Sequence, residues 1–157
     1  MHFVFLNTAF FMKISSLLAI LILVLSSCSK YSKKTEQLIS PMKAIELAAI
    51  AAPDTHQGIF EMTVKAGSLR DKMIFLNSEL DYRDQRNLTL VLRPVVIKEL
   101  AKKYGEDPLK YLLNKNVIVK GEAKRMKIWM FYKDKKLTKY YYQTHVFVNY
   151  TDQISIN

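Results

Sequence analysis

The stretch LTLVLRPVVIKELAKKYG, residues 88–105, decides the fold because its apolar spacing changes at Pro94. Leucines occupy every second position of residues 88–92, a spacing that predicts a strand with one buried face. Pro94 suits the first turn of a helix, and apolar residues then recur at helical spacing until Gly105 ends the element. The stretch therefore predicts a strand that leads directly into a helix.

Two further strands and a short helix are predicted upstream. Residues 60–66 alternate between apolar and polar side chains, Gly67-Ser68 interrupts the alternation, and residues 72–76 (KMIFL) are the expected hairpin partner. Ser40-Pro41 supplies the N-cap and first turn of a helix that ends before Pro53. The residues at helical spacing on its expected packing side are Met42, Ile45, Ala49 and Ala52.

Two longer strands are predicted downstream, after a short helical turn at residues 107–113. Residues 117–124 alternate, and this strand is expected to continue with a bend through residues 128–132. A charged turn at residues 133–136 connects it to a strand at residues 137–148. The complete order is three strands, a helical connection and two strands.

This order resembles the OB-fold, a five-stranded and partly open Greek-key barrel. The resemblance covers about residues 57–156, and segments 74–77, 87–91 and 116–121 look like strand and turn sequences of small OB-like domains of exported bacterial proteins. It implies a mainly β domain over residues 40–157: an OB-fold-like five-stranded barrel with a helix between strands 3 and 4, preceded by a short N-terminal helix. These segments carry no catalytic signature, and a fold alone does not specify a function.

The N-terminal residues have the layout of an export signal. Met12-Lys13 precedes the largely apolar residues 14–25, and the small pair Ser26-Ser27 then precedes Cys28, the only cysteine of the chain. The apolar run has 12 residues, whereas a membrane-spanning helix needs about 20. A transmembrane anchor is therefore disfavoured, and an ordinary secretory signal remains the alternative to a lipid-modified one.

The tetrad at residues 25–28 (LSSC) resembles the lipobox of bacterial lipoproteins. The resemblance implies a signal peptide at residues 1–27, with Met12 as an alternative start to Met1, and lipidation of Cys28. Residues 28–39 are then a lipidated tether. In that family an Asp after the cysteine retains the protein in the inner membrane, so in a Gram-negative cell Ser29 implies an outer-membrane lipoprotein that faces the periplasm. In a Gram-positive cell the same residues imply the outer face of the plasma membrane.

The charge of the chain favours anionic partners. The formal net charge is +10 at pH 7, and removal of the first 27 of the 157 residues, which include the single base Lys13 and no acid, leaves 130 residues with a charge of +9. Phospholipid head groups, acidic polymers and nucleic acids are partners of this kind.

The sequence predicts no catalytic residue, no metal site and no cofactor. It lacks the common nucleophile and nucleotide-binding motifs, and His56 and His145 lie far apart without ligand-spaced neighbours. Glu79, Asp81 and Asp84 share the loop at residues 77–87 with Arg83 and Arg86, and such a set could perform acid–base catalysis. The alternative is that these mixed charges merely solvate the loop.

Binding has the stronger signal. OB-folds bind ligands on the face of strands 2 and 3 and with the loops that join strands 1–2 and 4–5. Here these loops correspond to residues 67–72 and to the hairpin at residues 125–142, in which aromatic and cationic residues interleave. Arg83 and Arg86 of the loop at residues 77–87 are added to these. The complete set of candidate binding residues is Arg70, Lys72, Arg83, Arg86, Lys127, Trp129, Phe131, Tyr132, Lys133, Tyr140 and Tyr142.

Aromatic faces beside cations suit the stacking of bases, and they equally suit a membrane interface. The competing interpretation is that half of these aromatics form the barrel core. We expect a non-catalytic binding or adaptor module at the cell envelope, anchored in the membrane through Cys28, with an anionic ligand or an envelope protein as partner. The alternative is an OB-fold protein that binds single-stranded DNA or oligonucleotides.

Overall fold

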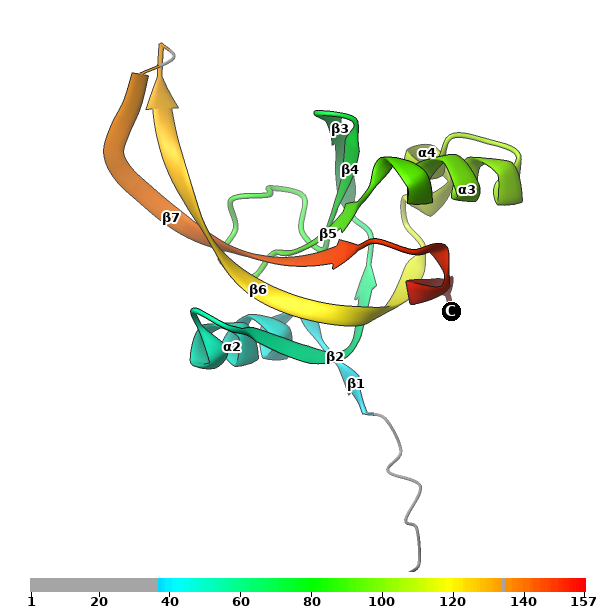
Figure 1. Cartoon of the computed structure of the whole chain (residues 1–157), viewed down its shortest axis with the longest axis horizontal. Helices are drawn as coiled ribbons and strands as arrows, with labels where there is room; N and C mark the ends of the chain where they lie inside the picture. Colours follow the sequence, from blue (N-terminus) through cyan, green and yellow to red (C-terminus); the bar gives the residue numbers. More distant parts are fainter. Residues whose placement is uncertain (1–36, 134) are drawn as a thin grey trace, which may run out of the picture. The chain divides into compact units, whose positions relative to one another are not determined.

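A mainly β fold organises the part of the chain that can be described. The computed structural model describes residues 37–133 and 135–157, so the predicted signal peptide and Cys28 lie outside the described residues. The described strands are β1 (Leu38–Ile39), β2 (Thr55–Thr63), β3 (Ala66–Arg70), β4 (Met73–Asn77), β5 (Leu88–Leu92), β6 (Asn116–Tyr132), β7 (Lys135–Val148) and β8 (Ile154–Ile156). They form one eight-stranded sheet in the order β1-β2-β6-β7-β5-β4-β3, with β8 paired to β6 (Figure 1).

Three α-helices confirm the helical predictions: α2 (Pro41–Ala51), α3 (Pro94–Tyr104) and α4 (Pro108–Leu112). Each begins with proline in its first turn, where a missing N–H costs no hydrogen bond. Gly105 ends α3 in the left-handed conformation, at φ 74°, and donates its N–H to the Ala101 carbonyl. A 3₁₀ turn, η1 (Thr151–Gln153), precedes β8. None of the described helices is long and apolar enough to cross a membrane.

The strand pairing is antiparallel except at two places. β6 pairs antiparallel with β2, β7 and β8, and β4 pairs antiparallel with β3 and β5. β5 and β7 are parallel neighbours, which is possible because α3, α4 and β6 lie between them in the chain. The short β1 pairs parallel with β2, so Leu38 and Ile39, assigned above to the tether, are part of the fold.

The sheet has eight strands rather than the five expected. The predicted first strand is divided into β2 and β3, and β1 and β8 are short additions at its margins. β1 and β3 end the described path of paired strands, so closure into a barrel is not part of the described pairing.

The predicted break at Gly67-Ser68 is wrong, because both residues lie inside β3. The hairpin instead turns at Asp71 and Lys72, which both have positive φ angles of 51° and 63°, as a two-residue turn between twisted strands requires. Gly67 has a different purpose. A Cβ atom there would lie 2.5 Å from Cδ1 of Leu109, so the glycine allows α4 to pack closely on β3.

The core lies on one side of the strands and includes α2. Its largest fully buried side chains come mainly from β2, β4, β5, α3, α4 and β6, and all of them except Val91 form one cluster with Ala44 and Ala48 of α2. The predicted packing side of α2 is therefore wrong, and Met42 is 58% exposed. The small alanine side chains let the helix backbone approach the sheet closely.

β5 is buried on both sides. The predicted alternation is confirmed for Leu88, Leu90 and Leu92, which belong to the core cluster. Val91 is also fully buried but does not belong to that cluster. Side chains on the opposite side of the sheet must therefore cover Val91, and these side chains belong to the candidate site.

Candidate nucleic-acid interface

The hairpin of β6 and β7 has two parts with different neighbours. β2 pairs with β6 only as far as Lys124, and β5 pairs with β7 from Thr144 onward. Beyond those residues the two strands pair only with each other, as a two-stranded ribbon that extends past the rest of the sheet (Figure 1). We call this ribbon, residues 125–132 and 135–143, the arm.

One side of the arm collects alternating cations and aromatic rings. We call Arg125, Lys127, Trp129, Tyr140 and Tyr142 the arm face. Cζ of Arg125 lies 3.8 Å from the ring centroid of Tyr142, and Nζ of Lys127 lies 3.9 Å and 4.5 Å from those of Tyr140 and Trp129. The rings of Trp129 and Tyr140, and of Tyr140 and Tyr142, also meet edge to face. The structure thus brings together four of the predicted binding residues.

These contacts give the arm face an internal function. A two-stranded ribbon alone is only marginally stable in water, and cation–π contacts contribute roughly 0.5–1 kcal/mol each at exposed sites. The cations of the arm face already cover the rings beside them. The arm face therefore stabilises the ribbon through its own contacts, while Tyr140 and Tyr142 remain exposed.

The interpretation of half the arm aromatics as core is wrong for the side chains at its end. Phe131 and Tyr132 are both 64% exposed, and Tyr140 and Tyr142 are also exposed. No strand other than the partner covers the arm among the described residues, so alternation does not bury either side. Lys133, another predicted binding residue, follows directly after β6 and has a positive φ of 44°.

A second aromatic row lies on the opposite side of β7, away from the core. We call Tyr141, Gln143, His145 and Phe147 of β7, together with Phe75 of β4, the β7 face. The His145 ring centroid is 6.4 Å from that of Phe75 and 6.1 Å from that of Phe147, both edge to face. Phe75 and Phe147 are register partners of Val91, which explains its burial. Their half-buried rings retain exposed surface.

Hydrogen bonds hold the polar members of the β7 face. Nε2 of Gln143 donates to the Tyr82 carbonyl and to the Tyr141 hydroxyl, and Oε1 of Gln143 lies 2.8 Å from Nε2 of His145. Because the Gln143 oxygen is an acceptor, Nε2 of His145 carries the proton. Burial lowers the pKa of His145 to about 4, so the imidazole is neutral at pH 7.

Arginines flank this row at both ends. Cζ of Arg93 lies 5.6 Å from the ring centroid of Phe147. Burial raises the pKa of Tyr141, and the charges of Arg83 and Arg70 oppose that rise, which places both guanidinium groups within electrostatic reach of Tyr141. Lys124 is the register partner of His145. Among the described residues, neither Arg93 nor Lys124 has a carboxylate partner.

The predicted loop cations Arg83 and Arg86 are each bound by a neighbouring carboxylate. Arg83 Nη2 lies 3.1 Å from Asp81 Oδ2, and Arg86 Nη2 lies 2.8 Å from Asp84 Oδ2. Hydrogen bonds from the arginines lower the pKa of Asp81, and lower that of Asp84 to about 2. Carboxylates with such low pKa values are poor general bases near neutral pH, which weighs against the acid–base interpretation of this loop.

The remaining predicted cations, Arg70 and Lys72, lie at the β3–β4 hairpin. Nε of Arg70 is 3.4 Å from Oδ2 of the exposed Asp71, and Lys72 is exposed at the turn. Neither makes a described contact with the arm face. The described residues also contain no group of three or more His, Cys, Asp or Glu side chains placed to hold a metal ion.

A buried amide network anchors the loop at residues 78–87 beside the β7 face. Nδ2 of Asn87 donates to Oδ1 of Asn77 at 3.1 Å and to Oγ1 of Thr89 at 3.0 Å, and Oδ1 of Asn87 accepts from the Glu79 N–H. Asn87 also donates to the Tyr82 carbonyl, the same oxygen that Gln143 contacts. Asn87 therefore joins the loop to the β7 face.

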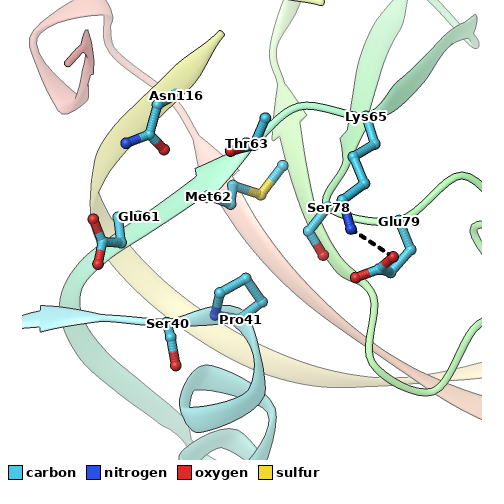
Figure 2. A pocket seen from close by; sticks show the side chains of 9 residues that line it. All are labelled: Ser40, Pro41, Glu61, Met62, Thr63, Lys65, Ser78, Glu79 and Asn116. Atoms are coloured by element: carbon cyan, nitrogen blue, oxygen red, sulfur yellow. Dashed lines mark hydrogen bonds and ion pairs between the residues drawn. The ribbon is translucent and has the colours of Figure 1, made fainter. Parts of the chain in front are cut away.

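A polar pocket lies at a different part of the sheet. Its lining residues come from the start of α2, from β2, from the first residue of β6 and from the loops beside them, as Figure 2 shows. Nζ of Lys65 and Oε2 of Glu79 form an ion pair of 2.8 Å at its edge. None of the predicted binding residues lines this pocket.

None of the five residues of the β7 face is among the candidate binding residues predicted from the sequence, and Arg93 and Lys124 beside them are also missing from those candidates. A signal existed, because OB-folds use the outer face of strands 2 and 3 and Phe75 alternates with the core residues Ile74 and Leu76. The contribution of β7 had no such signal, since the parallel pairing of β5 with β7 joins residues more than 50 positions apart.

Comparisons with known proteins give little beyond this geometry. No protein-family model matches the sequence, and no curated protein matches it. The structure is distantly similar to an aspartyl-tRNA synthetase from Leishmania major Friedlin, with 14% identity, a TM-score of 0.39 and coverage of 90% of this chain. A second likeness is to the aspartyl-tRNA synthetase of Entamoeba histolytica, with 15% identity, a TM-score of 0.38 and coverage of 71%. The chain spans 26% and 20% of the lengths of those two proteins.

Proposed function

We propose that the protein is a non-catalytic OB-type module that binds single-stranded nucleic acid across the β7 face. The observation that carries the proposal is the row of aromatic rings on β7 and β4 with guanidinium groups at both ends. Bases stack on aromatic faces whatever their identity, and cations beside the rings hold the phosphates.

The pairing supports an OB-type arrangement if β2 and β3 act as one bent strand. Val64 and Lys65 separate them, yet the N–H of Val64 donates to the Lys115 carbonyl and the N–H of Lys65 donates to that of Asn77. The bent strand would then connect β6 to β4. Five strands would follow one another around a closed barrel, with α3 and α4 between the third and the fourth.

The ligand chemistry follows from the cations beside the row. Arg93 and Lys124 are the cations best placed to take phosphates, because no described carboxylate neutralises them. Arg83 would have to exchange Asp81 for a phosphate, which gains little in solvent. Double-stranded DNA cannot offer its base faces to such a row, so a single strand is the expected ligand.

The N-terminal segment supports a location for this activity. We propose that lipidation at Cys28 anchors the protein in the outer membrane, with residues from 29 onward in the periplasm. Nucleic acid outside the cytoplasm, either extracellular or in the course of DNA uptake, would then be the ligand. An envelope adaptor is the second candidate, and the exposed aromatic side chains of the arm favour it.

A neighbouring pair of tyrosines tests the proposal. Tyr141 belongs to the β7 face and Tyr142 to the arm face, so Tyr141→Ala should weaken binding of a labelled oligothymidylate about tenfold, whereas Tyr142→Ala should change it less than about twofold. Fluorescence anisotropy across a salt series measures both. The logarithm of the association constant should fall against the logarithm of salt with a slope of about −0.7 for each phosphate contacted.

Other results would contradict the proposal. Equal losses for the two tyrosines, or duplex DNA bound as tightly as a single strand, would show that the β7 face does not stack bases. Binding of neither form, with crosslinking of the full chain to one envelope protein, would favour the adaptor function instead.

A further inference from the structure

The end of the arm exposes three consecutive apolar or aromatic side chains. Met130 is 45% exposed, and Phe131 and Tyr132 are each 64% exposed. Lys133 and Lys135 lie beside them and are also exposed. We call residues 130–133 and 135 the arm tip. A soluble surface rarely gathers this much apolar area at one projecting point unless a partner covers it.

The arrangement of these side chains restricts the partner. Successive residues of a strand point to opposite sides, and both sides of the ribbon are open because no third strand is paired with the arm among the described residues. A ligand laid on one side of the ribbon, such as a nucleic-acid strand, would leave the other apolar side chain in water. A partner that surrounds the tip would cover both.

The charge of the arm restricts the partner further. Residues 125–145 contain six Lys and Arg residues and one Asp. Aromatic rings with lysines at their margin match the interface of an anionic bilayer, where rings lie at head-group level and ammonium groups meet phosphate. An apolar element of this kind enters about 5–10 Å into the boundary between head groups and acyl chains.

We infer that the arm tip docks into the interface of an anionic phospholipid bilayer, with Phe131 and Tyr132 as its inserted side chains. This function goes beyond the nucleic-acid binding proposed for the β7 face and does not depend on it. It also does not depend on lipidation at Cys28, although an anchored chain would dock more readily because its tip is already held near the membrane.

The single tryptophan reports on this docking. Trp129 is the only tryptophan of the chain, and at about 3.3 Å per residue it lies within 10 Å of the inserted side chains. The full chain is mixed with vesicles of phosphatidylcholine, with or without phosphatidylglycerol, whose acyl chains carry bromine. Quenching of Trp129 then measures docking of the arm even if the N-terminal apolar run attaches the chain to every vesicle.

We expect quenching in the phosphatidylglycerol vesicles, with a shift of the emission to shorter wavelength. The double substitution Phe131→Ser and Tyr132→Ser should lower the ratio of docked to undocked arm about tenfold or more, the value for burial of one large apolar side chain. Tyr150→Ser is the matched control, because Tyr150 is 71% exposed in a different part of the fold, and it should leave the quenching unchanged.

Three results would overturn the inference. If quenching is the same with and without phosphatidylglycerol, and the same in the double variant as in the unchanged chain, the tip does not enter the bilayer. Quenching by oligothymidylate alone, and loss of it in the double variant, would assign the tip to the nucleic-acid surface. A smaller sedimentation coefficient of the double variant in lipid-free buffer would assign it to contact between two copies of the chain.

Discussion

The two halves of the β6–β7 hairpin have the same alternation but different burial. In the half that β2 and β5 flank, Val117, Val119 and Val146 are fully buried. In the arm, the equivalent positions hold Tyr140 and Tyr142, and both are exposed. The strand, its register and its partner continue from one half to the other, and only the neighbouring strands end.

This difference shows that a strand pattern specifies sides and not burial. Alternation sorts side chains onto two faces, but a face becomes core only if another element covers it. In the arm, aromatic and cationic side chains replace that missing cover with contacts to each other. Such a ribbon can therefore carry an exposed surface that a covered strand cannot.

A pair of aspartate substitutions on one side of β7 gives the largest expected effect. Val146→Asp places a charge in the core and should lower the free energy of unfolding by about 4 kcal/mol or more, because nothing compensates its desolvation. Tyr142→Asp, four residues away on the same side, should lower it by only about 1 kcal/mol, because it removes exposed contacts with Arg125 and Tyr140 and buries no charge. Urea denaturation followed by circular dichroism measures both. Similar losses would contradict the division of the hairpin into two halves.

A pH titration examines the boundary between the halves, where His145 lies. The unfolded imidazole has an ordinary pKa near 6.5, whereas burial lowers the folded pKa to about 4. Below about pH 6.5 the unfolded chain therefore binds a proton that the folded chain excludes, and stability should fall by up to about 3 kcal/mol as the pH falls to 4. Above pH 6.5 this group contributes no pH dependence.

His145→Gln provides the control for that titration. The variant should lose the decline between pH 6.5 and 4 but keep any decline at lower pH, where the Asp84 carboxyl binds a proton in the unfolded chain before it does so in the folded chain, in which its pKa is lowered to about 2. Thermal unfolding at a series of pH values separates the two ranges. A variant that retains the upper range would show that another group titrates there.

A smaller effect is expected from the loop at residues 78–87, which connects β4 to β5 and contacts Gln143 of the arm. Asn87→Ala leaves the buried oxygen of Asn77 and the Tyr82 carbonyl with fewer donors, and should cost about 1–3 kcal/mol. Gln85→Ala, an exposed neighbour in the same loop, should cost less than about 0.5 kcal/mol. Hydrogen exchange should also accelerate at residues 78–87 in the Asn87 variant alone. Unchanged hydrogen exchange at residues 78–87 would show that Asn87 does not anchor the loop.

Much of the fold could be predicted from the sequence, because local signals specify it. Prolines at three helix starts, Gly105 at a helix end and the alternation in β2, β5 and β6 all act within a few residues. The hairpin turn was misplaced because Gly67 was interpreted as a turn residue. Its missing side chain instead makes room for Leu109, which is distant in the sequence. The packing side of α2 was misplaced because helical spacing grouped Met42 and Ile45 with two alanines, whereas the core contains Ala44 and Ala48 instead.

Less of the candidate site could be predicted. Lys127, Trp129, Tyr140 and Tyr142 gather as expected, since a hairpin register brings them together. The β7 face could not be found by the same reasoning, because Phe75 and His145 meet only through the neighbouring β5. The arginines at residues 83 and 86 counted as candidates until the structure paired each with an aspartate two positions away.

The main helices and strands, their order, the basic charge and the interleaving of aromatics with cations in the last hairpin follow from the sequence, because they depend on neighbours along the chain. Which of those side chains are covered depends on how distant segments pack together. The ends of β2 and β5 leave the arm open, and the parallel pairing of β5 with β7 assembles the β7 face. Burial depends on contacts between distant segments, and a periodic pattern in one segment does not specify where another segment ends.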